Sequence, residues 1–298
     1  MVTPPPRLRV GIIGSGRVGA VLGAALRRTG HSIVGCSARS DLSRVRAEAL
    51  LPGVEILSPS EVAASCDLLL LTVPDDRLRE VVADIAAHVH PGQIVLHASG
   101  LHGLDVLASL SGVLPIAAHP VMTFTGTSLD LDRLEDCPFG VTSPEPVRPI
   151  AEALVVEMGG DPVWVDESAR TTYHAALAHG ANHLVTLVAQ TLDLLAAAGV
   201  EDPARLARPL LTAALDNTLR EGDAALTGPV ARGDAATVRA HLVDLTDADS
   251  GTREAYLVMA RATLDRALSS GRLPASSAEP IADLLVDVER AWSAGERP

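Results

Sequence analysis

Residues 10–19 read V-G-I-I-G-S-G-R-V-G, and this stretch decides the fold of the 298-residue chain. The apolar run 10–13 is typical of a buried strand, and residues 20–28 read as a helix. Between strand and helix, three glycines keep the G-x-G-x-x-G spacing of a dinucleotide-binding turn. The cofactor-binding residues predicted in this turn are Gly14, Ser15, Gly16, Arg17, Val18 and Gly19.

Each glycine of such a turn has a separate task. Gly14 permits the tight turn, Gly16 lets a pyrophosphate approach the backbone, and Gly19 lets helix and strand pack closely. The free N–H groups at the start of the helix then face the anion. We therefore predict a bound dinucleotide rather than a purely structural turn.

The end of the second predicted strand, residues 32–35, indicates which dinucleotide is bound. About 20 residues past the glycines, a site that prefers NAD carries a carboxylate for the ribose 2′-hydroxyl. Here the chain has Ser37, Arg39 and Ser40 instead. An arginine and hydroxyls suit a 2′-phosphate, which a carboxylate would repel. We therefore predict NADP rather than NAD, although Asp41 follows directly and an ordinary polar loop is the alternative.

The rest of the first half alternates strands with helical segments, which predicts an α/β fold with a parallel, doubly wound sheet. Ligands of such sheets sit at the carboxyl ends of the strands. Val73, Pro74 and the segment 97–100 are therefore expected beside the cofactor, with Ser99 among its contacts. The further strands predicted are residues 54–57, 67–73, 93–97, 113–118, 139–142 and 163–165.

After residue 166 no strand pattern recurs, and the chain reads as helices punctuated by proline and glycine. We predict two domains: residues 1–166 bind NADP, and residues 167–298 form an all-α domain for substrate binding and dimerisation. The predicted helices are residues 168–198, 203–221, 234–245, 251–269 and 279–291.

Composition excludes several classes of protein. A formal charge of −13 and a pI near 5.1 argue against binding to nucleic acid or to an anionic membrane. Three scattered cysteines indicate reduced thiols, and we expect no metal site. Residues 1–6 read as a loose leader without a signal sequence, so we expect a soluble cytoplasmic protein. The chain contains no lysine.

Five histidines are candidates for the cleft: His97, His119, His174, His179 and His183. A nicotinamide-dependent reductase needs polar donors for the substrate carbonyl or imine and a group that delivers a proton. Histidine suits the proton role near neutral pH. Packing or capping is the alternative, and for His97 it is the favoured one. His119 precedes Pro120, which indicates a shaped loop.

Two stretches of the helical half add candidates. Asn182 lies with His174 and His179 in a polar stripe that also includes Tyr173, and a cleft would satisfy these groups. The alternative is a core asparagine with surface histidines. In residues 226–234, Thr227 and Arg232 are candidates for a substrate carboxylate, whereas Asp234 is expected to cap a helix.

Five motifs together resemble the bacterial Rossmann-like proteins that carry a C-terminal helical domain of unknown function. This family is similar in layout to pyrroline-carboxylate reductase, ketopantoate reductase and the 6-phosphogluconate-dehydrogenase-like enzymes. The resemblance implies an NADPH-dependent reductase, often a homodimer through the helical domain, and some members resemble an alternative ketopantoate reductase of pantothenate synthesis. The motifs are G-S-G-R-V-G (14–19), H-A-S-G (97–100), A-H-P-V-M-T-F (118–124), Y-H-A-A-L-A-H-G-A-N (173–182) and L-T-G-P-V-A-R-G-D (226–234).

The chain departs from that wider superfamily at one position. Enzymes of this layout use a helix lysine four residues before an asparagine. If Asn182 is that asparagine, the matching position holds Ala178. A histidine or water must then supply the proton, or the protein is not a dehydrogenase.

We predict an NADPH-dependent reductase of a small 2-oxo acid, with 2-dehydropantoate as the favoured substrate. An imine reductase of the pyrroline-carboxylate type and a non-catalytic NADP-binding regulator are the alternatives. Arg232 is expected to bind the substrate carboxylate, and a histidine is expected to supply the proton. The predicted catalytic residues are His119, Asn182, His174, Ser99 and Arg232.

Overall fold

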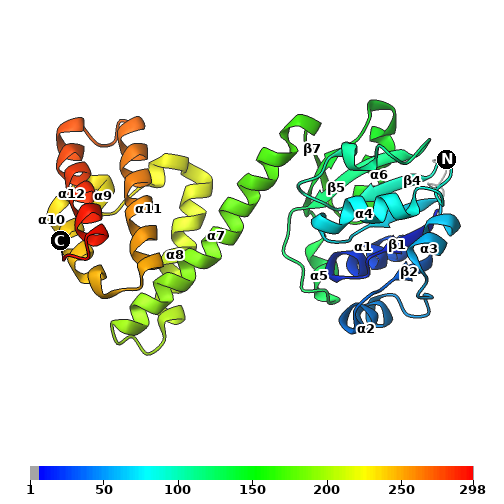
Figure 1. The fold of residues 1–298 in the computed structure, drawn as a ribbon, viewed down its shortest axis with the longest axis horizontal. Helices are drawn as coiled ribbons and strands as arrows, with labels where there is room; N and C mark the ends of the chain where they lie inside the picture. Colours follow the sequence, from blue (N-terminus) through cyan, green and yellow to red (C-terminus); the bar gives the residue numbers. More distant parts are fainter. Residues whose placement is uncertain (1–6, 298) are drawn as a thin grey trace. The chain divides into compact units, whose positions relative to one another are not determined.

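The structure, a computed structural model, describes residues 7–297, so the leader predicted for residues 1–6 lies outside the described residues. The chain forms two compact units, Met1–Gly180 and Ala181–Pro298 (Figure 1). They meet within the long helix α7 (Arg170–Ala197), whereas the sequence placed the boundary at residue 166. We describe each unit by itself.

The first unit is built on one seven-stranded sheet with the order β2-β1-β3-β4-β5-β6-β7. The first turn of the fold runs from β1 through α1 to β2, and β3 then returns to the other side of β1. This reversal is the topological switch point, where a doubly wound sheet opens a crevice for ligands. The strands are β1 (Arg9–Ile13), β2 (Ser32–Ser37), β3 (Leu68–Leu71), β4 (Ile94–His97), β5 (Leu114–Pro120), β6 (Pro138–Thr142) and β7 (Asp161–Trp164).

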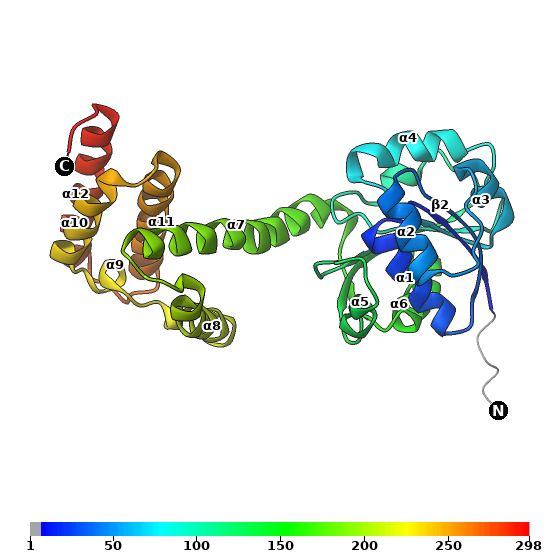
Figure 2. The same ribbon diagram turned by 90° about the horizontal axis from the view of Figure 1, so that it is seen from below.

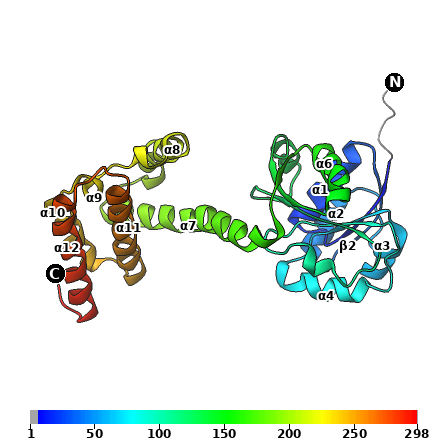
Figure 3. The same ribbon diagram turned by 90° about the horizontal axis from the view of Figure 1, so that it is seen from above.

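Helices cover both faces of this sheet, as Figures 2 and 3 show. One apolar core joins the sheet to α1, α2, α5 and α6, and a second joins the opposite face to α3, α4 and the 3₁₀ helix η1. The predicted α/β doubly wound class is therefore confirmed. The helices are α1 (Arg17–Arg28), α2 (Asp41–Leu50), α3 (Pro59–Ser65), α4 (Asp75–Ile85), α5 (Leu129–Arg133), α6 (Arg148–Glu157) and η1 (Leu104–Leu107).

The sheet is not wholly parallel, because β6 runs antiparallel to β5. The connection between these strands, residues 121–137, is long enough for a parallel crossover, so its length does not set the direction of β6. β7 then returns parallel to β6 through α6.

The strand predicted at residues 54–57 is wrong. Only Ile56 pairs with the sheet, through a single bridge to Cys36. The segment lies between the Pro52-Gly53 turn and Ser58, whose hydroxyl caps α3, so too few residues remain extended for a ladder.

The sequence analysis also missed α2. Ser40 caps this helix: its Oγ accepts a hydrogen bond from the N–H of Ser43, and the Oγ of Ser43 accepts one from the N–H of Ser40. Such a capping box stabilises the first turn of a helix. Asp41 is the first helical residue, where the interaction of a carboxylate with the helix dipole is stabilising.

The second unit is all helical, as predicted. Its core is formed by α9 (Pro229–Arg232), α10 (Ala235–Asp244), α11 (Ser250–Ser269) and α12 (Ala275–Ser293). By contrast, α8 (Pro203–Glu221) buries only Ala207 fully. No helix among residues 7–297 is long and apolar enough to cross a membrane.

Candidate functional site

The glycine turn between β1 and α1 is held by backbone contacts from its neighbours. The N–H of Gly14 donates to Ser37 Oγ (3.1 Å), and the N–H of Ser15 donates to the carbonyl of Ser37 (2.9 Å). From β3, the hydroxyl of Thr72 donates to the carbonyl of Gly14 (2.8 Å). These bonds fix the turn at the switch point.

The three glycines of this turn differ in what surrounds them. Gly14 has a φ of +100°, which side chains rarely adopt, so the turn itself requires glycine. A Cβ on Gly19 would lie 2.3 Å from both the Gly14 carbonyl oxygen and Thr72 Oγ1, so helix packing requires glycine there. A Cβ on Gly16 would meet no atom within 4 Å, and its φ of −76° is ordinary. The protein itself therefore gives no reason for glycine at position 16.

The predicted 2′-phosphate residues lie at the end of β2, but two of them already have structural partners. The Ser37 hydroxyl accepts from Gly14, and Ser40 caps α2. Arg39 is exposed, and among residues 7–297 it has no hydrogen bond or ion pair. Of the three, Arg39 is therefore the side chain left available for an anion.

A second arginine near this turn was not predicted from the sequence. A Cβ on Gly126 would lie 2.7 Å from Nε of Arg46 and 3.0 Å from Cγ of Arg17, so these arginines flank one backbone position. The fully buried carboxylate of Asp130 holds that loop, accepting from the N–H of Gly126 (2.7 Å) and from both donors of Thr125. Arg46 was missed because it lies on α2, the helix that was missed.

A cleft of about 200 Å³ opens beside the glycine turn at the carboxyl ends of β3, β4 and β5. It brings together cofactor residues Val18 and Val73 with the predicted catalytic residues Ser99, His119 and His174. Pro74 is next to it as the cap of α4. The remaining lining residues are Thr72, Asp75, Ala98 and Gly100.

His119, on β5, is the histidine most constrained in this cleft. Its Nδ1 lies 2.9 Å from the Tyr173 hydroxyl, and its ring is edge-on to His174. Burial, and then the positive charge of Arg170, lower the pKa of His119 to about 4; Asp75 opposes this shift only weakly. His119 is therefore a neutral imidazole near pH 7, which can donate or accept hydrogen bonds but carries no charge.

The buried anchor of the cleft is Arg170, the first residue of α7, which the sequence analysis did not single out. Its guanidinium donates to the carbonyls of Ser99 (2.5 Å) and Gly140 (3.1 Å), and among residues 7–297 no carboxylate forms an ion pair with it. Burial lowers its pKa. One arginine thus joins the loop after β4 and the middle of β6 to α7. A single arginine at the start of a helix belongs to no motif, so the sequence did not indicate this role.

Ser99 is buried in the loop after β4, where its Oγ and its N–H each have a partner. Its Oγ accepts from the N–H of His102 (3.0 Å), and its own N–H donates to Nδ1 of His97 (3.3 Å). The Ser99 hydroxyl hydrogen is still available to a ligand in the cleft.

His97 takes the packing role that the sequence favoured. It is fully buried, and its Nε2 lies 2.9 Å from the carbonyl of Gly103, so Nε2 carries the hydrogen and Nδ1 accepts from Ser99. Burial lowers the pKa of His97 to about 4. The folded protein therefore holds this imidazole neutral.

We expect the free energy of unfolding to fall as the pH is lowered from about 6.5 to about 4. The unfolded chain binds a proton on His97 with an ordinary pKa of 6.5, while the folded protein resists it down to about 4. The loss for this side chain is about 3 kcal/mol by linkage. Urea denaturation between pH 4.5 and 7.5 measures it, and His97→Gln should make the curve shallower, while His119, whose pKa is also lowered to about 4, keeps the remaining slope. Equal slopes in both proteins would contradict the prediction.

The other predicted residues belong to the helical unit, and their roles stay predictions. Asn182 is exposed on α7, and Arg232 is exposed at the end of α9. Asp234 caps α10 by accepting from the N–H of Thr237 (3.1 Å), as expected. Among residues 7–297, no group of histidines, cysteines or carboxylates has the arrangement of a metal site.

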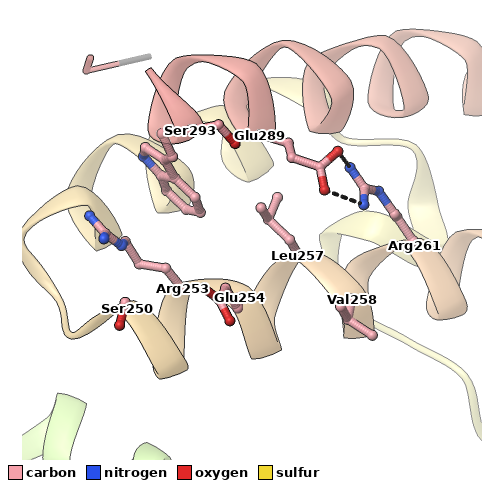
Figure 4. A pocket seen from close by; sticks show the side chains of 9 residues that line it. Ser250, Arg253, Glu254, Leu257, Val258, Arg261, Glu289 and Ser293 are labelled. Atoms are coloured by element: carbon pink, nitrogen blue, oxygen red, sulfur yellow. Dashed lines mark hydrogen bonds and ion pairs between the residues drawn. The ribbon is translucent and has the colours of Figure 1, made fainter. Parts of the chain in front are cut away.

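A separate hollow of about 410 Å³ lies between α11 and α12 and contains none of the predicted residues (Figure 4). Arg261 pairs there with both carboxylate oxygens of Glu289 (2.6 and 3.0 Å), and Arg253 lies over the Trp292 ring at 5.5 Å. Arg253 and Arg261 therefore already have partners in this hollow, whereas Arg39 beside the glycine turn has none among residues 7–297.

Two family models match the chain. A Rossmann-like domain matches residues 2–120, and a domain of unknown function, DUF2520, matches residues 137–263. This confirms the resemblance drawn from the five motifs.

One curated relative is the glycerol-3-phosphate dehydrogenase (NAD(P)+) of Anaeromyxobacter sp. (strain K). It is 29% identical over 153 residues, covering 45% of this chain and 46% of that protein. The chain thus spans about half the length of the curated relatives it matches.

Solved structures resemble the chain over most of its length. A protein from Bacteroides fragilis described as an NADP oxidoreductase has a TM-score of 0.73 at 21% identity, covering 87% of this chain and 98% of its own. A pyrroline carboxylate reductase from Plasmodium falciparum, solved with NADP bound, has a TM-score of 0.57 at 13% identity, covering 92% and 98%. At these identities the likeness shows the fold.

Proposed function

We propose that this chain, in which a Rossmann-like domain is followed by a DUF2520 domain, is an NADPH-dependent oxidoreductase that reduces a small 2-oxo acid. The first candidate substrate is 2-dehydropantoate. A bound nicotinamide would supply a hydride to the substrate carbonyl carbon. The chain's own residues would hold the cofactor, orient the carbonyl and deliver the proton.

The observation that carries this proposal is the open space at Gly16. The turn needs Gly14 for its backbone and Gly19 for its packing, but, apart from Gly16 and its two chain neighbours, no atom of residues 7–297 lies within 4 Å of the position of a Cβ on Gly16. A pyrophosphate lying against the backbone would explain that glycine, and the N–H groups at the start of α1 would face it. The curated relatives matched over part of the chain are also NAD(P)-dependent by name.

The residues beside the turn support the finer assignment. Arg39 lies at the end of β2 without a partner, and Arg17 and Arg46 flank Gly126 nearby. Within residues 7–297 these three cations have no carboxylate partner, which suits the extra phosphate of NADP. Ser99, His174 and the neutral His119 line one cleft, and we propose that they bind a substrate oxygen. Asn182 and Arg232 are proposed to complete substrate binding, with Arg232 on the carboxylate.

Calorimetric titration with NADPH and NADH tests the cofactor assignment. Wild type should prefer NADPH, and Arg39→Ala should weaken NADPH binding about 10- to 100-fold, the worth of a charge-assisted bond to phosphate, without affecting NADH. Arg239→Ala, which removes an exposed arginine of α10, is the matched control and should change neither affinity. Equal affinity of wild type for the two cofactors would overturn the NADP assignment.

Oxidation of NADPH in the presence of a panel of 2-oxo acids and cyclic imines tests the reaction. Turnover of 2-oxo acids supports the proposal, and turnover of cyclic imines alone would favour the reductase type found in the Plasmodium falciparum neighbour. Tight NADPH binding with no turnover on the whole panel would favour a non-catalytic regulator.

We also propose that the protein is a homodimer through the helical unit. Helices α7 and α8 expose more apolar side chains than the surface of a soluble protein usually carries. These side chains are Leu184, Val185, Leu187, Leu194, Leu206, Leu210, Leu215 and Leu219. A second copy packed against α7 and α8 would bury them.

A further inference from the structure

The chain lacks the helix lysine that supplies the proton in enzymes of similar layout, but another acid lies at the cleft. Tyr173, on the first turn of α7, places its hydroxyl 2.9 Å from Nδ1 of His119 on β5. The two rings are edge-on, with centroids 5.8 Å apart and an interplanar angle of 87°. Such an in-plane approach suits a hydrogen bond between the phenol and the ring nitrogen.

The position of Tyr173 is built into the backbone of β6. A Cβ on Gly140 would lie 2.3 Å from the Tyr173 oxygen and 2.5 Å from its Cζ, so only glycine leaves room for the phenol. Arg170, which lies 5.6 Å from the centre of the Tyr173 ring, donates to the carbonyl of the same Gly140. The phenol is therefore held between a strand and a buried cation.

The protonation state of His119 and the acidity of the phenol decide which of the two groups donates this hydrogen bond. Arg170 and His174 on α7 and Asp75 on α4 are the charged or titratable groups that face it besides Tyr173. The neutral imidazole carries one N–H, and a phenol is a much stronger acid than that N–H. The phenol is therefore the donor, Nδ1 is the acceptor, and Nε2 carries the hydrogen.

The other side of the imidazole faces the cleft. A Cβ on Gly100, which lines the cleft with His119, would lie only 3.1 Å from Nε2, so this edge of the ring lies close to the Gly100 backbone in the cleft. The hydrogen on Nε2 is thus available to a substrate oxygen bound beside Gly100.

We propose that Tyr173 is a positioning residue and proton relay: its hydroxyl holds His119 as the Nε2–H tautomer and replenishes the proton that His119 gives to the substrate. This inference rests on the proposed reductase function. It assigns the place of the missing lysine to a tyrosine and a histidine acting in series.

The proton transfer balances without a charged histidine. As the carbonyl carbon gains a hydride, the electrons of the C=O double bond move to oxygen, and that oxygen takes the proton from Nε2 of His119. Nδ1 takes the phenolic proton of Tyr173, so the imidazole changes tautomer and stays neutral. The phenolate left beside Arg170 regains a proton from water after the product leaves.

The tautomer can be measured without any substrate. In protein with nitrogen-15-labelled histidine, long-range nitrogen–proton correlation spectra distinguish Nε2–H from Nδ1–H, and His119→Gln identifies the signal. Wild type should show Nε2–H at His119, and Tyr173→Phe should lose that preference. An Nδ1–H signal in wild type would overturn the proposal, and this measurement requires no variant at Tyr173 to fold.

The relay itself is tested by kinetics with a matched control. Tyr173→Phe should keep its NADPH affinity and lose kcat about 100-fold, the usual worth of general acid catalysis. Rates in mixtures of light and heavy water should depend on two moving protons in wild type and on one in the variant. Tyr256→Phe removes the same hydroxyl from a similar pair, since Tyr256 lies 2.9 Å from His241 Nδ1 in the helical unit, and should leave kcat unchanged.

The outcomes separate this proposal from the reductase function. If NADPH binds and substrate turns over, but Tyr173→Phe alters neither kcat nor the isotope dependence, the relay is wrong. If no turnover occurs, the reductase function fails, while the tautomer measurement still decides whether Tyr173 orients His119.

Discussion

Replacing Gly16 by alanine is expected to weaken NADPH binding about 100-fold while leaving protein stability almost unchanged. A Cβ there meets no atom of the protein, and the backbone φ of −76° is one that alanine adopts freely. The free energy of unfolding should therefore stay almost unchanged. A pyrophosphate against the backbone would collide with the new methyl group, and overpacking of a tight contact costs about 3 kcal/mol.

Gly19→Ala, three residues along the same turn, is the matched comparison. Its Cβ would lie 2.3 Å from the Gly14 carbonyl oxygen and from Thr72 Oγ1, so strand and helix must move apart. We expect it to lower the free energy of unfolding by about 2 kcal/mol. Calorimetry with NADPH and urea denaturation of both variants measure the contrast.

The contrast between these two variants distinguishes a ligand site from a structural turn. If Gly16→Ala binds NADPH as tightly as wild type, the cofactor does not lie on this turn. If it unfolds as readily as Gly19→Ala, position 16 is constrained by the protein instead.

Arginine substitutions on α8 are expected to convert the proposed dimer into a monomer. Leu206 and Leu210 are four residues apart and share one face of the helix, while Leu215 and Leu219 share the opposite face. Burying a leucine contributes about 2 kcal/mol, so the two copies of one such pair in a dimer, four leucines, contribute about 8 kcal/mol. A charged side chain removes this contribution and resists burial.

Light scattering coupled to size-exclusion chromatography measures the mass of each double variant. The control places two arginines at Leu42 and Leu129 in the first unit, which are 67% and 64% exposed, close to the 57% and 72% of Leu206 and Leu210. The control should remain dimeric, and at least one α8 variant should be monomeric. A monomeric wild type, or two dimeric α8 variants, would refute the proposed interface.

Much of the fold could be predicted because its signals are local. The apolar run of residues 68–71 predicts the strand that it forms, and the glycine spacing after β1 predicts the turn that it forms. The errors occurred where pairing is decided at a distance. Residues 54–57 have strand-like composition but only one partner, and β6 has no local signal for the antiparallel direction that it takes beside β5.

The candidate site could be predicted only in part for the same reason. His119 and Ser99 follow strands, so the rule that ligands meet strand ends indicated both. Tyr173 was grouped with the polar residues of α7, but its bond to His119 joins residues 54 positions apart. Arg170 has no motif at all, because its partners are backbone carbonyls, which any residue supplies.

Arg170 gives this site an electric field that does not depend on pH. A lysine buried among carbonyl oxygens would lose its proton readily and its charge with it, whereas a guanidinium remains protonated throughout the neutral range. The dipoles of Ser99 and Gly140 are already aligned on that charge, so little reorganisation is needed when negative charge develops nearby. A lysine-free chain thus separates two duties that one lysine combines: a permanent cation supplies the potential, and a neutral pair carries the proton.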